Sequence, residues 1–284
     1  MLHVTNGDSP VSAIEQVTGS RNVLAWRDIL HEGPTPAGLR LEQLSDIRAR
    51  FLADCGFGKY KELRRQFGER DKALLSADAV TLWFEHDLYD QLQLIQILSA
   101  IPKKRTLLIC SDLYMGELDV EQMAKVQMLR SPVTESQFEL ARRAWVAFCA
   151  PDRQALDALV QEDTSALPFL GAALRRHLEE FPDERTGLGR NDSQILRAVE
   201  AGAKSFHEIF GATAQREEPR YMGDASLRFY IDRLTNCRKP LLTPGPIHLT
   251  DTGRKALAGE LNYVALNGLD RWLGGVHLQR NPTA

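Results

Sequence analysis

Three short clusters of acidic, histidine and amide side chains lie in the first 91 residues of this 284-residue chain. The side chains suited to moving a proton, or to orienting the group that moves it, are His31, His86 and Asp87. The residues that offer hydrogen-bond donors, acceptors or charge to a ligand are Asn6, Asp8, Ser9, Arg27, Glu32, Glu85, Asp90 and Gln91. Together these types predict binding of a small polar or phosphorylated molecule, with proton transfer if the protein is an enzyme.

Each cluster directly follows an apolar run of strand length. The predicted strands cover residues 2–5, 23–26, 80–84 and 107–110, and helical periodicity covers residues 41–53 and 88–100. Continuous apolar strands separated by helices indicate a parallel sheet covered on both faces, so the predicted fold class is a Rossmann-like α/β domain. Ligands bind at the carboxyl ends of such strands, and we therefore expect the three clusters to form one site.

Each cluster also has an explanation that requires no ligand. Asp90, in the first turn of a helix, could simply complement the helix dipole, and Arg27 could pair with Asp28 or Glu85 in a structural salt bridge. The residues that could serve only as helix caps are Asp8, Ser9 and Asp87. Both interpretations stay open from the sequence alone.

The motifs of common enzyme classes are missing from the sequence. There is no Walker loop, no G-x-G-x-x-G and no G-x-S-x-G, so the sequence identifies no cofactor. The spacing of His31, Glu32, His86, Asp87 and Asp8 fits none of the zinc signatures, and no metal site is predicted.

Composition narrows the possible partners and the compartment. A formal net charge of −3 gives no general attraction to nucleic acid or to an anionic membrane. No apolar stretch reaches the roughly 20 residues that cross a bilayer, and the first residues lack the regions of a signal peptide. The four cysteines form no C-x-x-C pair and suit a reducing cytosol. We expect a cytoplasmic protein with no membrane partner.

The rest of the chain changes character twice. The α/β pattern of residues 1–131 gives way to a helical bridge over 132–185 and then to a winged-helix-like domain over 186–260. In that last domain Asp192 and Ser205 are expected to cap helices, residues 222–235 form a third helix, residues 241–250 form a two-stranded wing, and a closing helix follows Thr250. Three helices followed by a wing are typical of DNA-binding proteins.

The charge of this domain does not favour DNA strongly. Residues 190–260 hold 11 lysines and arginines against 9 acidic residues. The arginines placed to contact DNA, if it binds, are Arg228, Arg233 and Arg254. Packing against other protein is the alternative role.

The final segment, residues 261–284, is apolar, glycine-containing and aromatic, unlike the polar ends of most chains. It is expected to pack back on the protein as a hydrophobic latch. If it reaches a binding site, Asn267, Arg271 and His277 become additional candidates.

Four sequence stretches resemble the DUF1835 family of bacterial proteins. They are HVTNGDS at 3–9, WRDILHEGP at 26–34, WFEHDLYDQ at 83–91 and LNGLDRWLGGVHL at 266–278. The likeness covers nearly the whole chain and implies a bacterial cytoplasmic protein, but it implies no catalytic residues.

Three functions are consistent with these observations. The first is a domain that binds, and as an enzyme would transform, a small ligand at the strand ends. The second is a transcriptional regulator in which the α/β domain senses a ligand and the winged helix binds DNA. The third is a protein-interaction scaffold, which is expected to satisfy its polar clusters by internal salt bridges.

Overall fold

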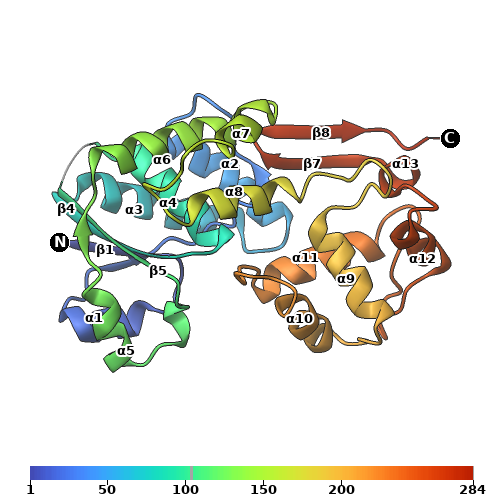
Figure 1. Ribbon diagram of the computed structural model, residues 1–284, viewed down its shortest axis with the longest axis horizontal. Coiled ribbons are helices and arrows are strands. Elements are labelled where there is room, and N and C mark those ends of the chain that lie inside the picture. Colours follow the sequence, from blue (N-terminus) through green and yellow to red (C-terminus); the bar gives the residue numbers. More distant parts are fainter. Residues whose placement is uncertain (103–104, 284) are drawn as a thin grey trace. The chain divides into compact units, whose positions relative to one another are not determined.

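The computed structural model describes residues 1–102 and 105–283, and the chain divides into two compact units (Figure 1). The first unit comprises Met1–Leu174 and Gly274–Val276, and the second comprises Arg175–Leu273 and His277–Ala284. The described residues form thirteen α-helices, a five-stranded sheet and a three-stranded sheet. None of the helices described is long and apolar enough to cross a membrane.

The five-stranded sheet has the order β2-β1-β4-β5-β6 and forms the centre of the first unit. Its strands are β1 (Leu2–Thr5), β2 (Val23–Ala25), β4 (Ala79–Glu85), β5 (Arg105–Ser111) and β6 (Ser131–Pro132). The first four are parallel, as predicted, and their register pairs Thr5 with Trp83 and Trp83 with Ile109. The sheet is nevertheless mixed, because the two-residue β6 pairs antiparallel with β5 at the edge.

Helices cover the two faces of this sheet (Figure 1). Helices α1 (Val11–Thr18) and α5 (Val120–Gln127) pack together on one face through Ile14, Met123 and Val126. On the other face, α4 (Leu88–Ala100) lies between the sheet and α6 (Glu135–Phe148). Because it is covered on both sides, α4 is buried almost all round.

The strand order reverses at β1. The chain leaves β1 through α1 to reach β2 on one side, whereas β4, β5 and β6 all lie on the other side. The carboxyl ends of β1 and β4 therefore border a topological switch point, where α/β proteins of this kind bind their ligands.

A helical pair, α2 (Leu41–Asp54) and α3 (Tyr60–Ser76), completes most of the first unit. Sequence periodicity predicted α2 but not α3. The reason is that α3 buries Arg70 and Asp71 on its inner face, between the apolar Phe67 and Leu74, so charged residues interrupt the apolar pattern. The Arg70 guanidinium lies over the rings of Trp26 and Phe67, 3.9 and 4.0 Å from their centroids.

Short elements join these parts. They are β3 (Gly33–Pro34), a 3₁₀ turn (Met115–Glu117), α7 (Gln154–Leu159) and α8 (Leu170–Leu178). Thr134 caps α6 in a capping box with Gln137. Pro10 occupies the N-cap of α1, and Ser9, a candidate cap from the sequence, lies outside the helix.

The second unit begins with three helices around one apolar core. These are α9 (Arg190–Glu200), α10 (Phe206–Ala214) and α11 (Asp224–Thr235), and α12 (Asp251–Ala258) and α13 (Tyr263–Asn267) follow. Its fully buried core side chains include Ile195, Leu196, Ile209, Leu227, Tyr230, Leu234 and Leu241. Ser205 forms the predicted capping box with Glu208, and Thr250 caps α12.

One prediction for this unit was wrong, and another is met only in part. Asp192 lies inside α9, where its carboxylate accepts from the Gly189 N–H, and Gly189 is the N-cap. The predicted two-stranded wing is reduced to a single antiparallel bridge between Leu242 and Leu249. The segment contains Pro240, Pro244 and Pro246, and a proline has no N–H to donate to a strand ladder.

The chain ends in a hairpin of β7 (Leu269–Gly274) and β8 (Val276–Arg280). Its tip belongs to the first unit, where the Gly275 N–H donates to Phe148 O over 2.9 Å and the Thr35 N–H donates to Gly274 O over 2.9 Å. A Cβ on Gly275 would lie 1.9 Å from the Cys149 carbonyl oxygen, so only glycine fits there. The expectation that the tail packs back on the protein is confirmed.

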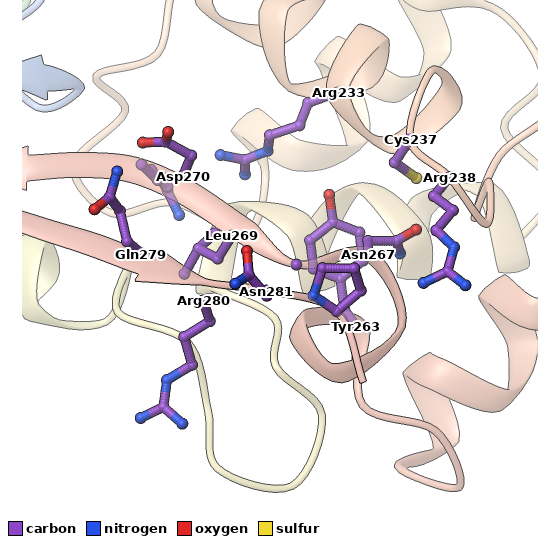
Figure 2. A pocket seen from close by; sticks show the side chains of 13 residues that line it. Arg233, Cys237, Arg238, Tyr263, Asn267, Leu269, Asp270, Gln279, Arg280 and Asn281 are labelled. Atoms are coloured by element: carbon purple, nitrogen blue, oxygen red, sulfur yellow. The ribbon is translucent and has the colours of Figure 1, made fainter. Parts of the chain in front are cut away.

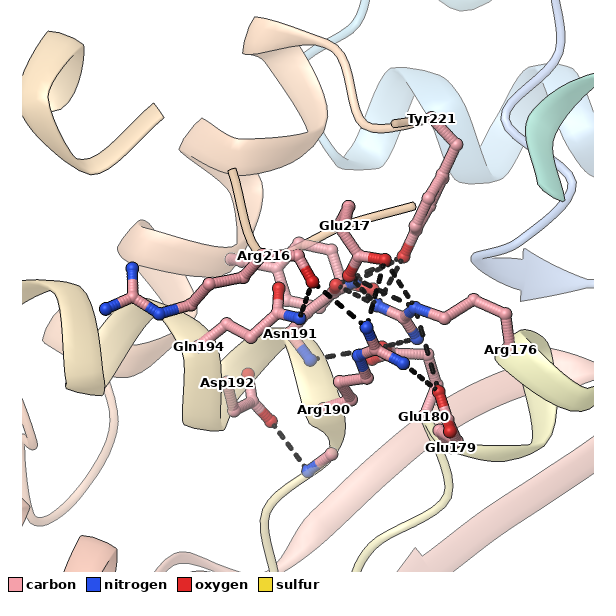
Figure 3. Close-up of polar contacts among 12 residues, drawn as sticks. Arg176, Glu179, Glu180, Arg190, Asn191, Asp192, Gln194, Arg216, Glu217 and Tyr221 are labelled. Atoms are coloured by element: carbon pink, nitrogen blue, oxygen red, sulfur yellow. Dashed lines mark hydrogen bonds and ion pairs between the residues drawn. The ribbon is translucent and has the colours of Figure 1, made fainter. Parts of the chain in front are cut away.

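A buried ionic network surrounds Arg176 in the second unit (Figure 3). Arg176 donates to Glu180 over 2.7 Å, to Glu217 over 2.9 Å and to the amide oxygen of Asn191 over 2.6 Å. Arg271 contacts the other carboxylate oxygen of Glu180 over 3.3 Å. Two buried glutamates thus face two buried arginines, and the negative and positive charges balance.

Candidate functional site

Three buried carboxylates meet where β4 ends and α4 begins. Glu85 is the last residue of β4, Asp87 is the N-cap of α4, and Asp90 lies in the first turn of that helix. One oxygen from each lies within 4.8 Å of the others. Their exposed fractions are 4, 4 and 0%, so water reaches them poorly. We call these three residues the acidic cluster.

Neutral hydrogen-bond donors from three strand ends hold the acidic cluster in place. Asp90 accepts from the Glu85 N–H over 2.6 Å and from Nδ2 of Asn6, just after β1, over 2.7 Å. Oε1 of Glu85 accepts from the N–H of Met115, which follows β5, over 2.8 Å. Asp87 accepts from the Asp90 N–H over 3.0 Å. The ends of β1, β4 and β5 thus contribute to one arrangement.

Charge in the acidic cluster is not balanced by a cation. Within residues 1–102 and 105–283, no lysine, arginine or histidine forms an ion pair with any of the three carboxylates. Burial, with the Asp87 charge, raises the pKa of Glu85 to about 8, and burial raises the pKa of Asp87 to about 7. Burial and the two neighbouring carboxylates also raise the pKa of Asp90 well above its usual range. The cluster therefore holds protons near neutral pH.

His86 lies beside the acidic cluster in sequence and packs among aromatic rings. Its ring centroid is 5.2 Å from that of Tyr114 and 5.7 Å from that of Phe169. Burial lowers the pKa of His86, while the Asp112 charge and a hydrogen bond with the backbone of Ser111 oppose that change. The ring is half-buried, and its neutral form is favoured at pH 7.

His31 is connected to the acidic cluster only indirectly, through Tyr89. The His31 ring is buried, and its centroid lies 6.3 Å from that of Tyr89 in an edge-on arrangement. The Tyr89 hydroxyl donates to the backbone oxygen of Asn6 over 3.2 Å. His31 thus touches a residue that contacts the site's Asn6, and it lies one side chain removed from the hydrogen bonds that hold the carboxylates.

The loop that carries His31 and Glu32 is fixed by a buried arginine from α2. Arg48 donates to Oδ1 of Asp28 over 2.8 Å, to the Glu32 carbonyl over 2.7 Å and to the Ile29 carbonyl over 3.1 Å. Both charged side chains of the Arg48–Asp28 pair are fully buried. Asp28 therefore has a structural partner, and this loop is held rigidly against α2.

Asp8 and Arg27 form an exposed ion pair with each other. Nε of Arg27 donates to the Asp8 carboxylate over 2.8 Å, and the two side chains are 54 and 68% exposed. One interpretation of the sequence paired Arg27 with Asp28 or Glu85, and the structure pairs it with Asp8 instead. Ser9 is also exposed. A Cβ added to Gly116 would lie 2.8 Å from the Cβ of Ser9. Within the described residues, none of these three side chains forms a hydrogen bond or ion pair with the acidic cluster's carboxylates.

Gln91 braces the acidic cluster from within α4. Its Nε2 donates to the Glu85 carbonyl over 2.6 Å and approaches Sγ of Cys110 at 3.5 Å. The amide thereby fixes the backbone at the end of β4. Of the predicted residues, the structure brings together Asn6, Glu85, Asp87, Asp90 and Gln91 in direct contact.

Sequence reasoning missed the contribution of the segment after β5. Tyr114 packs on His86, and the Met115 N–H donates to Glu85. Applying the strand-end rule to the fourth predicted strand as well as the first three points to this segment. Tyr89 was also missed, although it sits between Asp87 and Asp90 in the sequence.

The three arginines predicted to touch DNA have different surroundings in the second unit. Arg233 forms an ion pair with Asp192, over 2.6 Å, and is partly buried. Arg228 is exposed and lies 4.4 Å from the ring centroid of Phe206, and the exposed Arg254 approaches Asp251 at 3.4 Å.

Comparison with known proteins adds no identification. No family model matches the chain, and no match was found among curated proteins or solved structures. Membership of the DUF1835 family stays a prediction from the four sequence stretches. Two of these stretches, around Asn6 and around Glu85–Gln91, contribute to the acidic cluster and its contacts.

Proposed function

We propose that the first unit is a Rossmann-like domain that binds a small polar or phosphorylated molecule at the carboxyl ends of β1 and β4. The observation that carries this proposal is the acidic cluster, three buried carboxylates without a paired cation at the switch point of the sheet. Buried carboxylates are costly unless they are paired, so a fold that keeps three together has a use for them.

The cluster defines the chemistry of the ligand. Carboxylates accept hydrogen bonds and attract positive charge, so hydroxyl and amine groups of a polar molecule suit Glu85 and Asp87. A phosphate alone would be repelled, and a phosphorylated ligand would therefore bind together with a divalent cation, for which oxygen ligands are preferred. In either case the ligand compensates the negative charge that the cluster takes on when its carboxyl groups release their protons.

If the ligand is transformed, the proton carriers of this proposal are Glu85 and Asp87. Their pKa values of about 8 and about 7 allow each to give or take a proton near neutral pH. His86, with a lowered pKa, would accept a proton at the edge of the site. His31 is placed to orient Tyr89 rather than to reach the ligand.

The proposal is tested by a thermal-shift screen with Mg²⁺, Mn²⁺, nucleotides and sugar phosphates, alone and in combination. A ligand at 100 times its Kd adds about 2.7 kcal/mol to the free energy of unfolding, which raises Tm measurably. Glu85→Gln keeps an acceptor for the Met115 N–H but removes the charge, and we expect it to abolish the shift. Glu121→Gln, at an exposed helix position paired with Lys125, is the matched control and leaves the shift unchanged.

Native mass spectrometry of the purified protein provides the complementary readout. We expect a retained small molecule or cation in the wild type that Glu85→Gln loses. Equal shifts in Glu85→Gln and Glu121→Gln would place binding elsewhere and contradict the proposal. A scaffold without a ligand would show no shift with any probe.

A second candidate, the ligand-sensing regulator, draws on the helices of the second unit. Helices α9, α10 and α11, the Leu242–Leu249 bridge and α12 follow the element order of a winged helix. In this proposal Arg228 and Arg254, both exposed, contact phosphates, whereas Arg233 is engaged by Asp192. Salt-dependent duplex binding that weakens in Arg228→Ala would support it. No binding at low salt would eliminate it.

A further inference from the structure

A polar pocket lies in the second unit between the end of α11, helix α13 and the terminal hairpin (Figure 2). Its volume is about 580 Å³, within the range of small-molecule sites. Residues from three separate stretches line it, near positions 233–238, 263–271 and 279–282. The charge of this pocket is opposite to that of the acidic cluster.

Four arginines and one aspartate supply the charge of the pocket. The arginines are Arg233, Arg238, Arg271 and Arg280, and the acid is Asp270. In Figure 2, Arg233, Arg238 and Arg280 stand on different sides of the pocket. Four guanidinium groups against one carboxylate give the wall an excess of positive charge. The carboxylate of Asp270 is itself hydrogen-bonded to His277 over 2.7 Å.

Two of these arginines are anchored and two reach into solvent. Arg233 is fixed by Asp192, and Arg271 by Glu180 and by the Tyr230 hydroxyl over 3.1 Å. These contacts hold the guanidinium groups in place and reduce the entropy that a ligand must overcome. Arg238 and Arg280 are exposed and have no ion pair among the described residues.

Neutral groups give the pocket hydrogen bonding without negative charge. The Asn267 side chain is held by the backbone of Lys239, whose N–H donates to its oxygen over 2.6 Å. Gln279 and Asn281 add side-chain amides from the hairpin and the segment after it, and the buried Tyr263 forms part of the wall. Figure 2 shows Asn267, Tyr263 and Arg238 among the side chains that line the pocket.

We propose that this pocket binds a small organic anion, a phosphate or carboxylate compound up to the size of a mononucleotide. Guanidinium groups bind such anions through paired hydrogen bonds, and two anchored arginines with two adaptable ones suit an anion that carries two charges or more. The site is independent of the ligand proposed for the acidic cluster. This basic pocket at the end of α11 thus gives the second unit a ligand site of its own.

The test is isothermal titration of the full chain with adenosine 5′-monophosphate, inorganic phosphate and citrate at constant ionic strength. We expect saturable binding of at least one probe, with Kd rising at least tenfold in Arg238→Ala/Arg280→Ala. Both replaced side chains are exposed, and circular dichroism checks that the variant is folded. Arg197→Ala/Arg216→Ala removes the same two charges from exposed positions outside the pocket and leaves Kd unchanged.

Three results would overturn the proposal. The first is no saturable binding of any probe. The second is an equal loss in both double variants, which would indicate general charge attraction. The third is tighter binding of an oligonucleotide than of the mononucleotide, increasing with length and lost in Arg238→Ala/Arg280→Ala, which would assign the pocket to nucleic acid instead.

Discussion

The two units each bury a polar cluster, and the two clusters differ in charge balance. In the second unit, Arg176 and Arg271 face Glu180 and Glu217, and the charges cancel. In the first unit, the acidic cluster at the end of β4 has neutral N–H donors only. A balanced network has a structural role and needs no ligand, because the protein compensates each of its charges.

The first unit also contains balanced pairs, which makes the difference more informative. Arg48 pairs with Asp28, and Arg70 with Asp71, both fully or nearly buried. The same fold thus compensates buried carboxylates beneath α2 and α3 but not at the switch point of the sheet. Sites that bind or react often keep such uncompensated charge at a cost in stability.

The largest expected effect comes from breaking the balanced network. Arg176→Met leaves Glu180 and Glu217 buried without their main partner, and we expect a loss of about 3–5 kcal/mol in the free energy of unfolding. Urea unfolding measures it. Arg153→Ala, at an exposed pair with Asp157, serves as the control and costs about 1 kcal/mol or less. A loss in Arg176→Met as small as the control's would refute the structural role.

The next effect is on the pH dependence of stability. Raised carboxyl pKa values mean that, between about pH 4 and pH 8, the folded state binds more protons than the unfolded state. The contribution of the acidic cluster is therefore present at low pH and lost as pH rises through about 7 to 8. Its slope reaches about 1.4 kcal/mol per pH unit for each proton.

Unfolding of wild type and Glu85→Gln from pH 5 to pH 9 checks this dependence. The wild type should lose stability more steeply than the variant as pH rises. Parallel curves would show that the pKa of Glu85 is the same in the folded and the unfolded protein.

A smaller effect is expected from the donor that reaches the acidic cluster from β1. Asn6→Ala removes the hydrogen bond to Asp90, and we expect a loss of about 1–2 kcal/mol that is greater at pH 8 than at pH 5. Thermal unfolding at the two pH values measures it. A loss independent of pH would mean that Asn6 acts by packing and not by supporting charge.

The smallest effect concerns the exposed pair of Asp8 and Arg27. Arg27→Ala should change the free energy of unfolding by about 1 kcal/mol or less and leave ligand binding intact, because the pair lies in water. The ligand-induced shift in Tm is the readout. Loss of the shift in Arg27→Ala would show that Arg27 contributes to ligand binding, as the sequence predicts.

Much of the first unit follows from local sequence patterns. The four parallel strands, α2, α4 and the capping box of α6 were predictable because the apolar period and the capping residues agree there. Helix α3 was not, since its buried Arg70 and Asp71 depend on partners, Trp26 and Ser45, that lie far away in the sequence. The wing pairs over a shorter length than predicted, because Pro240, Pro244 and Pro246 lack the N–H groups that would extend its ladder.

The candidate site was predictable in outline and not in detail. The strand-end rule identified Asn6, Glu85, Asp87 and Asp90, but it grouped them with the exposed Asp8 and Arg27. What separates them is burial and strand order, in particular that β1 and β4 are neighbours. The tail's Asn267 and Arg271 were additional candidates in the sequence, and they line the basic pocket of the second unit.

The most direct test of the central claim is the free energy of unfolding of Glu85→Gln at pH 8. If the acidic cluster is kept for a ligand and not for stability, removing one charge should stabilise the ligand-free protein by about 1–3 kcal/mol. The same variant should lose the ligand-induced shift in Tm. A loss of stability of about 3 kcal/mol or more, like that expected for Arg176→Met, would contradict the account and make the cluster part of the structural framework.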